Sequence, residues 1–142
     1  MAEVWKKLQL HKASRALALH APGGDYGAVV GGVPEGVALD AEPAGENGTY
    51  DFVHLFVTSV AELEEKAGTA LAAIKPDGLL WFSYPKKTSK IKTDINRDAG
   101  WKVVRDAGYE AVTQIAVDDT WSALRFRPAS AIPSLTRKFT ND

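Results

Sequence analysis

Cysteine is absent from this chain of 142 residues. A disulfide framework, a thiolate zinc site and a cysteine nucleophile are therefore excluded. Long apolar runs are also missing, because none approaches the roughly 20 residues that a membrane-spanning helix needs. Residues 1–7 (MAEVWKK) lack the apolar segment and the cleavage site of a signal peptide. We therefore expect a cytoplasmic protein that has no membrane partner.

An excess of charge of one sign is missing as well. The chain has 17 Lys and Arg against 18 Asp and Glu, which gives a formal net charge of -1. Nucleic-acid binding through overall charge is therefore not expected, and only a local patch could attract a charged partner. Histidines and carboxylates do not recur at the spacings of a metal site, so we predict no metal. The motif Gly-x-Ser-x-Gly is absent, which excludes a nucleophile elbow.

What the chain does contain is an alternation of helical patterns and apolar runs. Helical spacing, or start and stop signals, predict helices over residues 4–10, 25–33, 60–74 and 94–107. Apolar runs predict parallel strands over residues 15–20, 36–40, 50–57 and 79–84. Two further β-patterned runs are joined by a loop so short that the strands must be antiparallel, and they cover residues 110–117 and 121–127.

This alternation predicts an α/β domain of three layers over residues 1–128, followed by a tail over residues 129–142. We expect a mostly parallel, six-stranded sheet that ends in an antiparallel hairpin. Right-handed crossovers favour the strand order 2-1-3-4-6-5, numbered along the chain. The length suits one ordinary domain that buries its own core.

Signals at the ends of helices support these boundaries. Ser59, followed three residues later by Glu62, predicts the capping box that starts the helix over residues 60–74. The sequence Lys75-Pro-Asp-Gly78 predicts the end of the same helix. Gly108 is expected to adopt the left-handed conformation that ends the next helix.

Several aromatic residues are expected in the core. Trp81 and Phe82 are neighbours in a buried strand and should point to opposite faces of the sheet. We expect Trp101 and Trp121 to share one core. His54 lies inside the most apolar strand, so we interpret it as a core residue with hydrogen-bond partners rather than as a ligand contact.

The most polar stretch of the chain begins where the strand over residues 79–84 ends. A cluster of lysines follows, mixed with hydroxyl and amide groups that suit phosphate oxygens. Ligands of open α/β sheets collect where the carboxyl ends of parallel strands meet such loops. We therefore predict a site for an anionic or phosphate-bearing small molecule, with a solvated charged surface as the alternative. The predicted ligand-binding residues are His20, Gly23, Asp40, Ser83, Tyr84, Lys86, Lys87, Lys90, Lys92, Asn96 and Arg97.

Four segments carry a resemblance to known proteins: YDFVHLFV (50–57), KPDGLLWFSYPK (75–86), KIKTDINR (90–97) and DDTWSALRFR (118–127). Over about residues 5–128 the chain is similar to an uncharacterised bacterial family of short proteins of unknown function. The layout also resembles a trimmed class I S-adenosylmethionine-dependent methyltransferase. The resemblance implies a Rossmann-like, methyltransferase-like fold and no particular activity.

The segment after the first strand departs from the methyltransferase pattern. Methyltransferases have an acidic residue and a Gly-x-Gly type loop there, whereas this chain has His20-Ala-Pro-Gly-Gly-Asp25. Pro22 restricts the backbone where glycine would allow it to approach a cofactor. Asp40 stands where a ribose-binding acid could lie, although an Asp at a strand end is as readily a turn residue. S-adenosylmethionine is therefore possible but disfavoured as a cofactor.

These observations favour a non-catalytic domain that binds an anionic small molecule or a partner, and we predict no catalytic residue. The enzymatic alternative is a degenerate methyltransferase. The structural alternative is an assembly subunit that pairs through its hairpin edge or its tail. Asp118 and Asp119, which could form an acid/base pair, are interpreted as turn residues.

Overall fold

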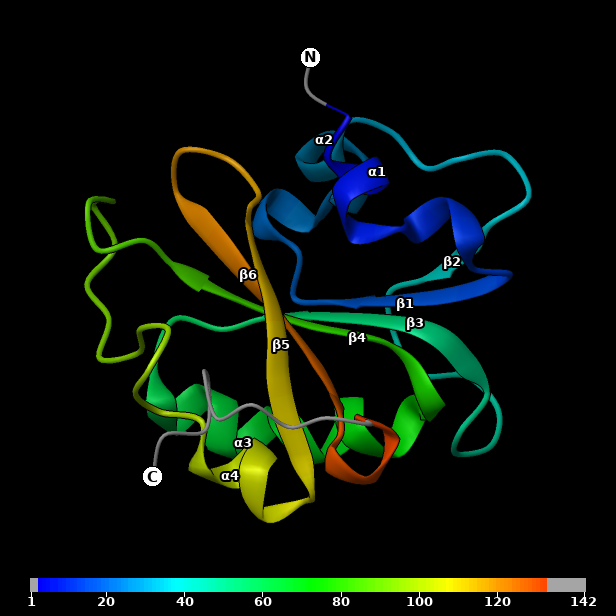
Figure 1. Ribbon diagram of the computed structural model, residues 1–142. Helices are drawn as coiled ribbons and strands as arrows, with labels where there is room; N and C mark the ends of the chain where they lie inside the picture. Colours follow the sequence, from blue (N-terminus) through cyan, green and yellow to red (C-terminus); the bar gives the residue numbers. More distant parts are fainter. Residues whose placement is uncertain (1–2, 133–142) are drawn as a thin grey trace.

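The computed structural model describes residues 3–132, which form a six-stranded sheet with helices on both faces (Figure 1). One face is covered by α1 (Val4–Leu8) and α2 (Tyr26–Val30), and the other by α3 (Val60–Ala73) and α4 (Lys102–Asp106). Short 3-10 turns lie at Leu10–Lys12, Pro22–Gly24 and Ala129–Ala131. No helix in the described part of the chain has the length and apolarity needed to cross a membrane.

The strand order β2-β1-β3-β4-β6-β5 confirms the predicted sheet. The strands are β1 (Arg15–Leu19), β2 (Ala38–Asp40), β3 (Tyr50–Phe56), β4 (Ile74–Pro85), β5 (Tyr109–Ala116) and β6 (Trp121–Pro128). The first four are parallel, and β6 is antiparallel to both β4 and β5, as the short loop between β5 and β6 predicted. The strand β3 and the part of β4 from Leu79 onward are covered on both faces, which is why these segments are mostly apolar, whereas Lys75-Pro-Asp-Gly78 at the start of β4 is largely exposed.

The sheet separates two hydrophobic cores. Trp81 belongs to the core under α1 and α2, whereas Phe82 belongs to the core above α3 and α4, so the predicted alternation is confirmed. The prediction that Trp101 and Trp121 share a core is wrong. Trp101 packs on the α3 side, but Trp121 alternates with Leu124 on β6 and therefore faces the α1 side.

The predicted helix over residues 94–107 is wrong in its first half. Within this range only α4, in the second half, is helical. Asp94 was expected to begin that helix, but its carboxylate accepts a hydrogen bond from the backbone nitrogen of Val60 (2.8 Å) at the start of α3. The chain then makes a turn closed by a bridge between Asn96 and Ala99. Gly100 follows with φ +104°, a conformation that disfavours a helix start at this point.

Other helix and strand boundaries differ from the predicted ones for local reasons. The first helix ends at Gln9, which is left-handed (φ 64°), so the predicted continuation to residue 10 becomes a separate turn. Lys75-Pro-Asp-Gly78 lies inside β4 as a bulge rather than between helix and strand, because Asp77 is held by Arg127 at 2.8 Å. The remaining helix and strand ends differ from the prediction by a few residues.

The turn Ala129–Ala131 lies directly after residue 128, where the predicted domain ends. The backbone nitrogen of Ala129 donates to the carbonyl of Gly108 (2.8 Å), which ties the turn after β6 to the end of α4. Gly108 itself is left-handed (φ 93°), as predicted for a residue that ends a helix. Most of the predicted tail, residues 133–142, lies outside the described residues.

Candidate functional site

The predicted site residues fall into two groups at the carboxyl edge of the sheet. His20, Gly23 and Asp40 follow β1 and β2, whereas the lysines follow β4. His20 and Asp40 line one hollow, and Lys87 lines another, so the structure does not gather all the predicted residues into one cavity. The described residues hold no cluster of three or more metal-ligating side chains.

The hollow after β1 and β2 is small, at about 210 Å³. Pockets for small molecules usually measure about 300–1,000 Å³. His20 is exposed at its mouth in a left-handed conformation (φ 59°), and Gly23 (φ 70°) is exposed in the turn that follows. The lining residues are Ala18, His20, Ala21, Gly24, Tyr26, Leu39, Asp40 and Ala41.

The carboxylate of Asp40 is already engaged inside the protein. It accepts a hydrogen bond from the hydroxyl of Tyr50 at 2.5 Å and pairs with the guanidinium of Arg15 at 3.5 Å. The guanidinium also lies over the Tyr50 ring, 4.7 Å from its centroid. Burial raises the pKa of Tyr50, and the hydrogen bond to Asp40 raises it further. A ligand would have to compete with these partners for the Asp40 carboxylate.

Ser83 belongs to a buried hydrogen-bonded network and lines neither of these two hollows. The Nδ1 atom of His54 lies 2.7 Å from the Tyr26 hydroxyl, and its Nε2 atom lies 2.6 Å from the Ser83 hydroxyl. The His54 ring is fully buried and stacks on Phe56 at 4.3 Å. Burial lowers the pKa of His54 to about 3, so the ring is neutral at physiological pH. The interpretation of His54 as a core residue with hydrogen-bond partners is confirmed.

Tyr84 is also buried and does not line the hollow that Lys87 lines. The strand β4 continues to Pro85, so Ser83 and Tyr84 lie inside the sheet and not at its mouth. The Tyr84 hydroxyl accepts a hydrogen bond from the Gln114 amide at 2.7 Å. Burial raises the pKa of Tyr84. The hydrogen bond from Gln114 and the nearby charge of Arg97 lower this pKa and offset part of the increase.

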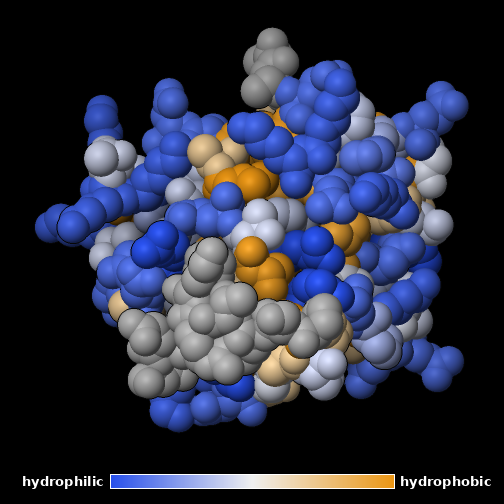
Figure 2. All heavy atoms as spheres, viewed as in Figure 1, coloured by the Kyte–Doolittle hydropathy of each residue, from blue (hydrophilic) through white to orange (hydrophobic). Residues whose placement is uncertain are grey.

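The segment after β4, residues 86–97, is named the basic loop here. It is anchored at both ends. The backbone nitrogen of Lys86 donates to the Thr120 carbonyl (2.7 Å), and the Trp101 indole donates to the Asn96 carbonyl (2.7 Å). Asp94 adds the bond to α3. Between these anchors the chain projects beyond the end of β4, at the left of Figure 1, and this side of the surface is largely hydrophilic (Figure 2).

The basic loop surrounds a hollow of about 490 Å³, which is within the usual range for a small-molecule pocket. Among residues 3–132, the ammonium groups of its lysines have no ion-pair or hydrogen-bond partner, whereas Arg97 pairs with Asp98 at 3.3 Å. The single acidic residue in the lining is Asp94, whose carboxylate accepts a hydrogen bond from the amide of Val60 at the start of α3. The lining residues are Lys87, Ser89, Lys90, Ile91, Lys92, Thr93, Asp94, Ile95 and Asn96.

Part of this lining was not anticipated from the sequence. Ile91 and Ile95 face the hollow, although the prediction included only polar residues there. The available signal was an isoleucine placed between two lysines in an otherwise polar loop. Lys86, which was predicted to bind ligand, is half-buried at the anchor and does not line the hollow.

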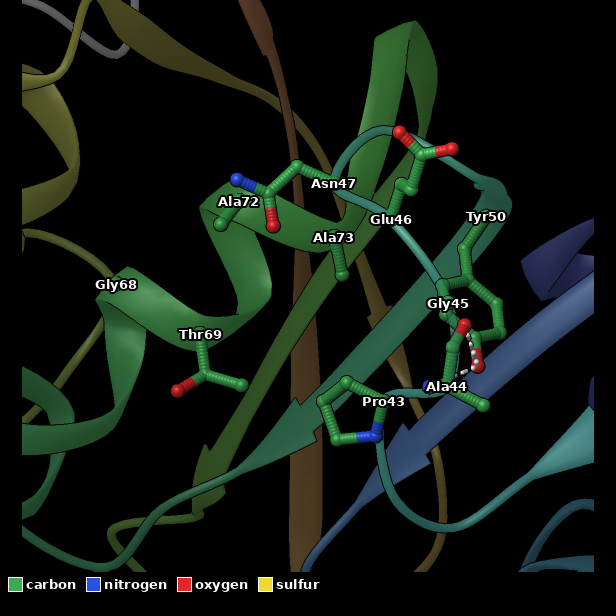
Figure 3. A pocket seen from close by; sticks show the side chains of 10 residues that line it. All are labelled: Pro43, Ala44, Gly45, Glu46, Asn47, Tyr50, Gly68, Thr69, Ala72 and Ala73. Carbon is green, nitrogen blue, oxygen red and sulfur yellow. Dashed lines mark hydrogen bonds between the residues drawn. The ribbon is translucent and has the colours of Figure 1, made fainter.

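A third hollow, of about 360 Å³, lies away from the predicted site (Figure 3). It exists because residues 41–49 cross from β2 to β3 without the helix that usually covers such a crossover. The crossover is held to α3 by a bond from the Gly48 nitrogen to the Ala72 carbonyl (2.8 Å). Asn47 extends toward α3, whereas the α3 side of the hollow is built from small residues such as Gly68 and Ala72. Its lining has no charged cluster.

The comparisons with known proteins concern the fold. No protein-family model matches the chain, and no curated protein matches it, so membership of the uncharacterised bacterial family stays a prediction. An S-adenosylmethionine-dependent methyltransferase from Aquifex aeolicus is similar in structure, with a TM-score of 0.63 at 14% identity over 87% of this chain and 86% of that one.

Two further solved structures support the same conclusion. The N-methyltransferase NodS from Bradyrhizobium japonicum, in complex with S-adenosyl-L-homocysteine, has a TM-score of 0.51 at 12% identity over 87% of this chain and 83% of that one. The complex of DhpI with the same compound has a TM-score of 0.56 at 12% identity, over 89% and 82%. The chain therefore has the Rossmann-like α/β fold of class I methyltransferases, and identities this low show the fold alone.

Proposed function

We propose that this protein is a non-catalytic domain of methyltransferase fold that binds an anionic small molecule in the hollow of the basic loop. The observation that carries the proposal is that Lys87, Lys90 and Lys92 line one hollow of about 490 Å³, while their ammonium groups have no ion-pair or hydrogen-bond partner within residues 3–132. Like charges held close together repel one another, and a bound anion relieves that repulsion. The anchors at Asp94 and Asn96 hold the loop in place before the ligand arrives.

The partners of two titratable side chains of the sheet, His54 and Asp40, support the absence of catalysis. His54 is neutral and enclosed between Tyr26 and Ser83. Asp40 is held by Tyr50 and Arg15. General acid-base catalysis needs a titratable group within hydrogen-bonding reach of a substrate, and the side chains of His54 and Asp40 already have partners within the protein.

The test is a thermal-shift series with inorganic phosphate, sulfate, ATP and coenzyme A at low and high salt. An anion that binds only the folded protein should raise Tm in proportion to its occupancy. The gain should fall with salt, because exposed charges are screened over roughly 8–10 Å at physiological ionic strength. The variant Lys87→Ala/Lys90→Ala should lose the gain. The matched control is Lys7→Ala/Lys75→Ala, which removes equal charge from exposed positions elsewhere. This control variant should keep the gain in Tm.

Two outcomes would count against the proposal. A gain that persists in Lys87→Ala/Lys90→Ala would place the anion outside the basic loop. A gain of equal size at low and high salt would mean that charge does not drive binding.

A degenerate methyltransferase is the second candidate, and the fold likeness favours it. Two of the similar structures contain S-adenosylhomocysteine. On this alternative the cofactor would use the hollow with His20 and Asp40, which would have to widen and free the Asp40 carboxylate. Calorimetric titration with S-adenosylmethionine decides between the two. Binding that Asp40→Ala abolishes and Lys87→Ala/Lys90→Ala leaves intact would favour the methyltransferase.

A further inference from the structure

Ile91 lies between two lysines and lines the same hollow as they do. Its exposed fraction is 37%, and Val33 is the other large hydrophobic residue exposed to this degree within residues 3–132. Single exposed hydrophobic side chains are common on protein surfaces, so exposure by itself indicates nothing. Ile91 differs from Val33 because its apolar surface and the ammonium groups of Lys87, Lys90 and Lys92 share one hollow.

The packing of the loop does not explain this position. Apolar anchoring is provided by Ile95, which is only 3% exposed and fits closely against Gly100, where an added Cβ would lie 3.3 Å from the Ile95 Cγ1 atom. The backbone of Ile91 takes part in a local turn with Ser89. Its nitrogen donates to the Ser89 hydroxyl oxygen at 3.3 Å, and the same hydroxyl donates to its carbonyl at 3.5 Å. This turn holds the Ile91 backbone and leaves its side chain partly exposed beside the lysines.

We infer that the ligand of the basic loop is an amphiphilic anion, a phosphate or carboxylate group attached to an alkyl or aromatic body. This inference rests on the function proposed above and specifies the class of ligand. The lysines bind the charged group, and Ile91 contacts the apolar body. Contact with an apolar body removes the Ile91 side chain from water, which favours binding independently of charge.

The two parts of the ligand should respond differently to salt. Charge attraction weakens as ionic strength rises, whereas burial of apolar surface does not weaken in the same way and is strengthened by sulfate or phosphate salts. An amphiphilic anion should therefore keep more of its affinity at high salt than inorganic phosphate does. At a purely ionic site, the affinity for the amphiphilic anion and the affinity for inorganic phosphate would fall by the same factor.

The experiment measures Kd by calorimetry for inorganic phosphate, phenyl phosphate and hexyl phosphate. Wild type should bind both esters about tenfold more tightly than phosphate, as expected when a side chain of this size leaves water. Ile91→Ser should remove this preference and leave the Kd for phosphate unchanged. Val33→Ser, the matched control at equal exposure, should behave as wild type. Both substitutions are at exposed positions, so the fold is expected to survive them.

A vesicle arm separates the two sources of such a ligand. Co-sedimentation with phosphatidylcholine vesicles that contain phosphatidic acid, without binding of the soluble esters, would identify a lipid headgroup and would contradict the expected lack of a membrane partner. Binding of soluble esters without co-sedimentation would identify a free metabolite. Either result supports an amphiphilic ligand provided that it depends on Ile91.

Failure of this inference differs from failure of the proposed function. If phosphate and both esters bind equally well, the ligand is a plain anion, and the proposed function stands without the amphiphilic class. If phosphate, the esters and the vesicles all fail to bind, the proposed function is overturned as well. A preference for esters that survives Ile91→Ser would place the apolar contact elsewhere.

Discussion

The interior of β4 and the basic loop that follows it use polar groups in opposite ways. In β4 the side chains of Ser83 and Tyr84 are buried, and the hydroxyl of each has a hydrogen-bond partner on another strand of the sheet. A few residues later, Lys87 and Lys90 are exposed, and their ammonium groups have no partner among residues 3–132. In β4 the polar groups therefore bond within the protein, whereas in the adjacent basic loop the ammonium groups are free to bind a ligand.

The difference shows how a site can be recognised in a protein without obvious catalytic residues. A buried polar group without a partner is costly, and the buried hydroxyls of Ser83 and Tyr84 have partners within the protein. An exposed ammonium group is hydrated and needs no partner, so it can exchange water for an anion. The availability of polar groups, more than their number, separates the basic loop from the sheet interior. The following predictions test that separation, from the largest expected effect to the smallest.

Removal of the largest buried side chain of β4 should have the greatest effect. Trp81→Ala should lower the free energy of unfolding by about 3–5 kcal/mol, because it leaves a cavity and removes the partner of the Leu8 carbonyl, which accepts from the indole at 3.1 Å. Urea denaturation measures the loss. Trp5→Ala is the control, since Trp5 is only half-buried on α1. An equal loss in both variants would contradict the central place of β4.

The buried network should make stability depend on pH. The folded-state pKa of His54 is depressed from the ordinary 6.5 to about 3, so below pH 6.5 the unfolded chain takes up a proton that the folded protein does not. Stability is therefore complete above pH 6.5 and falls as pH decreases toward 3, by about 1.4 kcal/mol per unit. Between pH 7.5 and 4.5 the loss should be about 2–3 kcal/mol. His54→Gln should show a shallower dependence, and an unchanged slope would be inconsistent with a neutral, buried His54.

The anchor of the basic loop should have an intermediate effect. Asp94→Ala removes the acceptor for the Val60 amide at the start of α3, and loss of such a cap costs about 0.5–2 kcal/mol. Asp98→Ala is the matched control, because Asp98 is exposed and pairs only with Arg97, and it should cost no more than about 0.5 kcal/mol. Equal unfolding free energies for the two variants would show that Asp94 does not hold the loop.

The lysines of the basic loop should contribute least to stability. Without ligand, Lys87→Ala/Lys90→Ala should change the free energy of unfolding by no more than about 0.5 kcal/mol, because both side chains are exposed and their ammonium groups have no ion-pair or hydrogen-bond partner within residues 3–132. The same variant should lose the stabilisation by anions described above. Chemical denaturation with and without phosphate measures both quantities. A large loss without ligand would mean that the lysines serve the fold, and the contrast with β4 would fail.

The strand order, the hairpin and the opposite faces of Trp81 and Phe82 were predictable from the sequence alone. They follow from short-range patterns, because a strand alternates its side chains between two faces and a short loop can join only antiparallel neighbours. The start of α3 was predictable for the same reason, since the Ser59 hydroxyl accepts from the Glu62 nitrogen at 3.1 Å within a single turn. The position of the basic loop after β4 was equally local.

Tertiary structure decided which polar groups remain available. Asp40 meets Tyr50 and Arg15 only because β1, β2 and β3 lie side by side. His54 and Ser83 are 29 residues apart in sequence and are joined by the pairing of β3 with β4. A sequence pattern indicates which face of a strand or helix a side chain lies on. It does not indicate the partner of a buried polar group, because that partner comes from another element. Exposure of Ile91 beside the lysines likewise depends on Asp94 and Ile95 being held by α3 and the core.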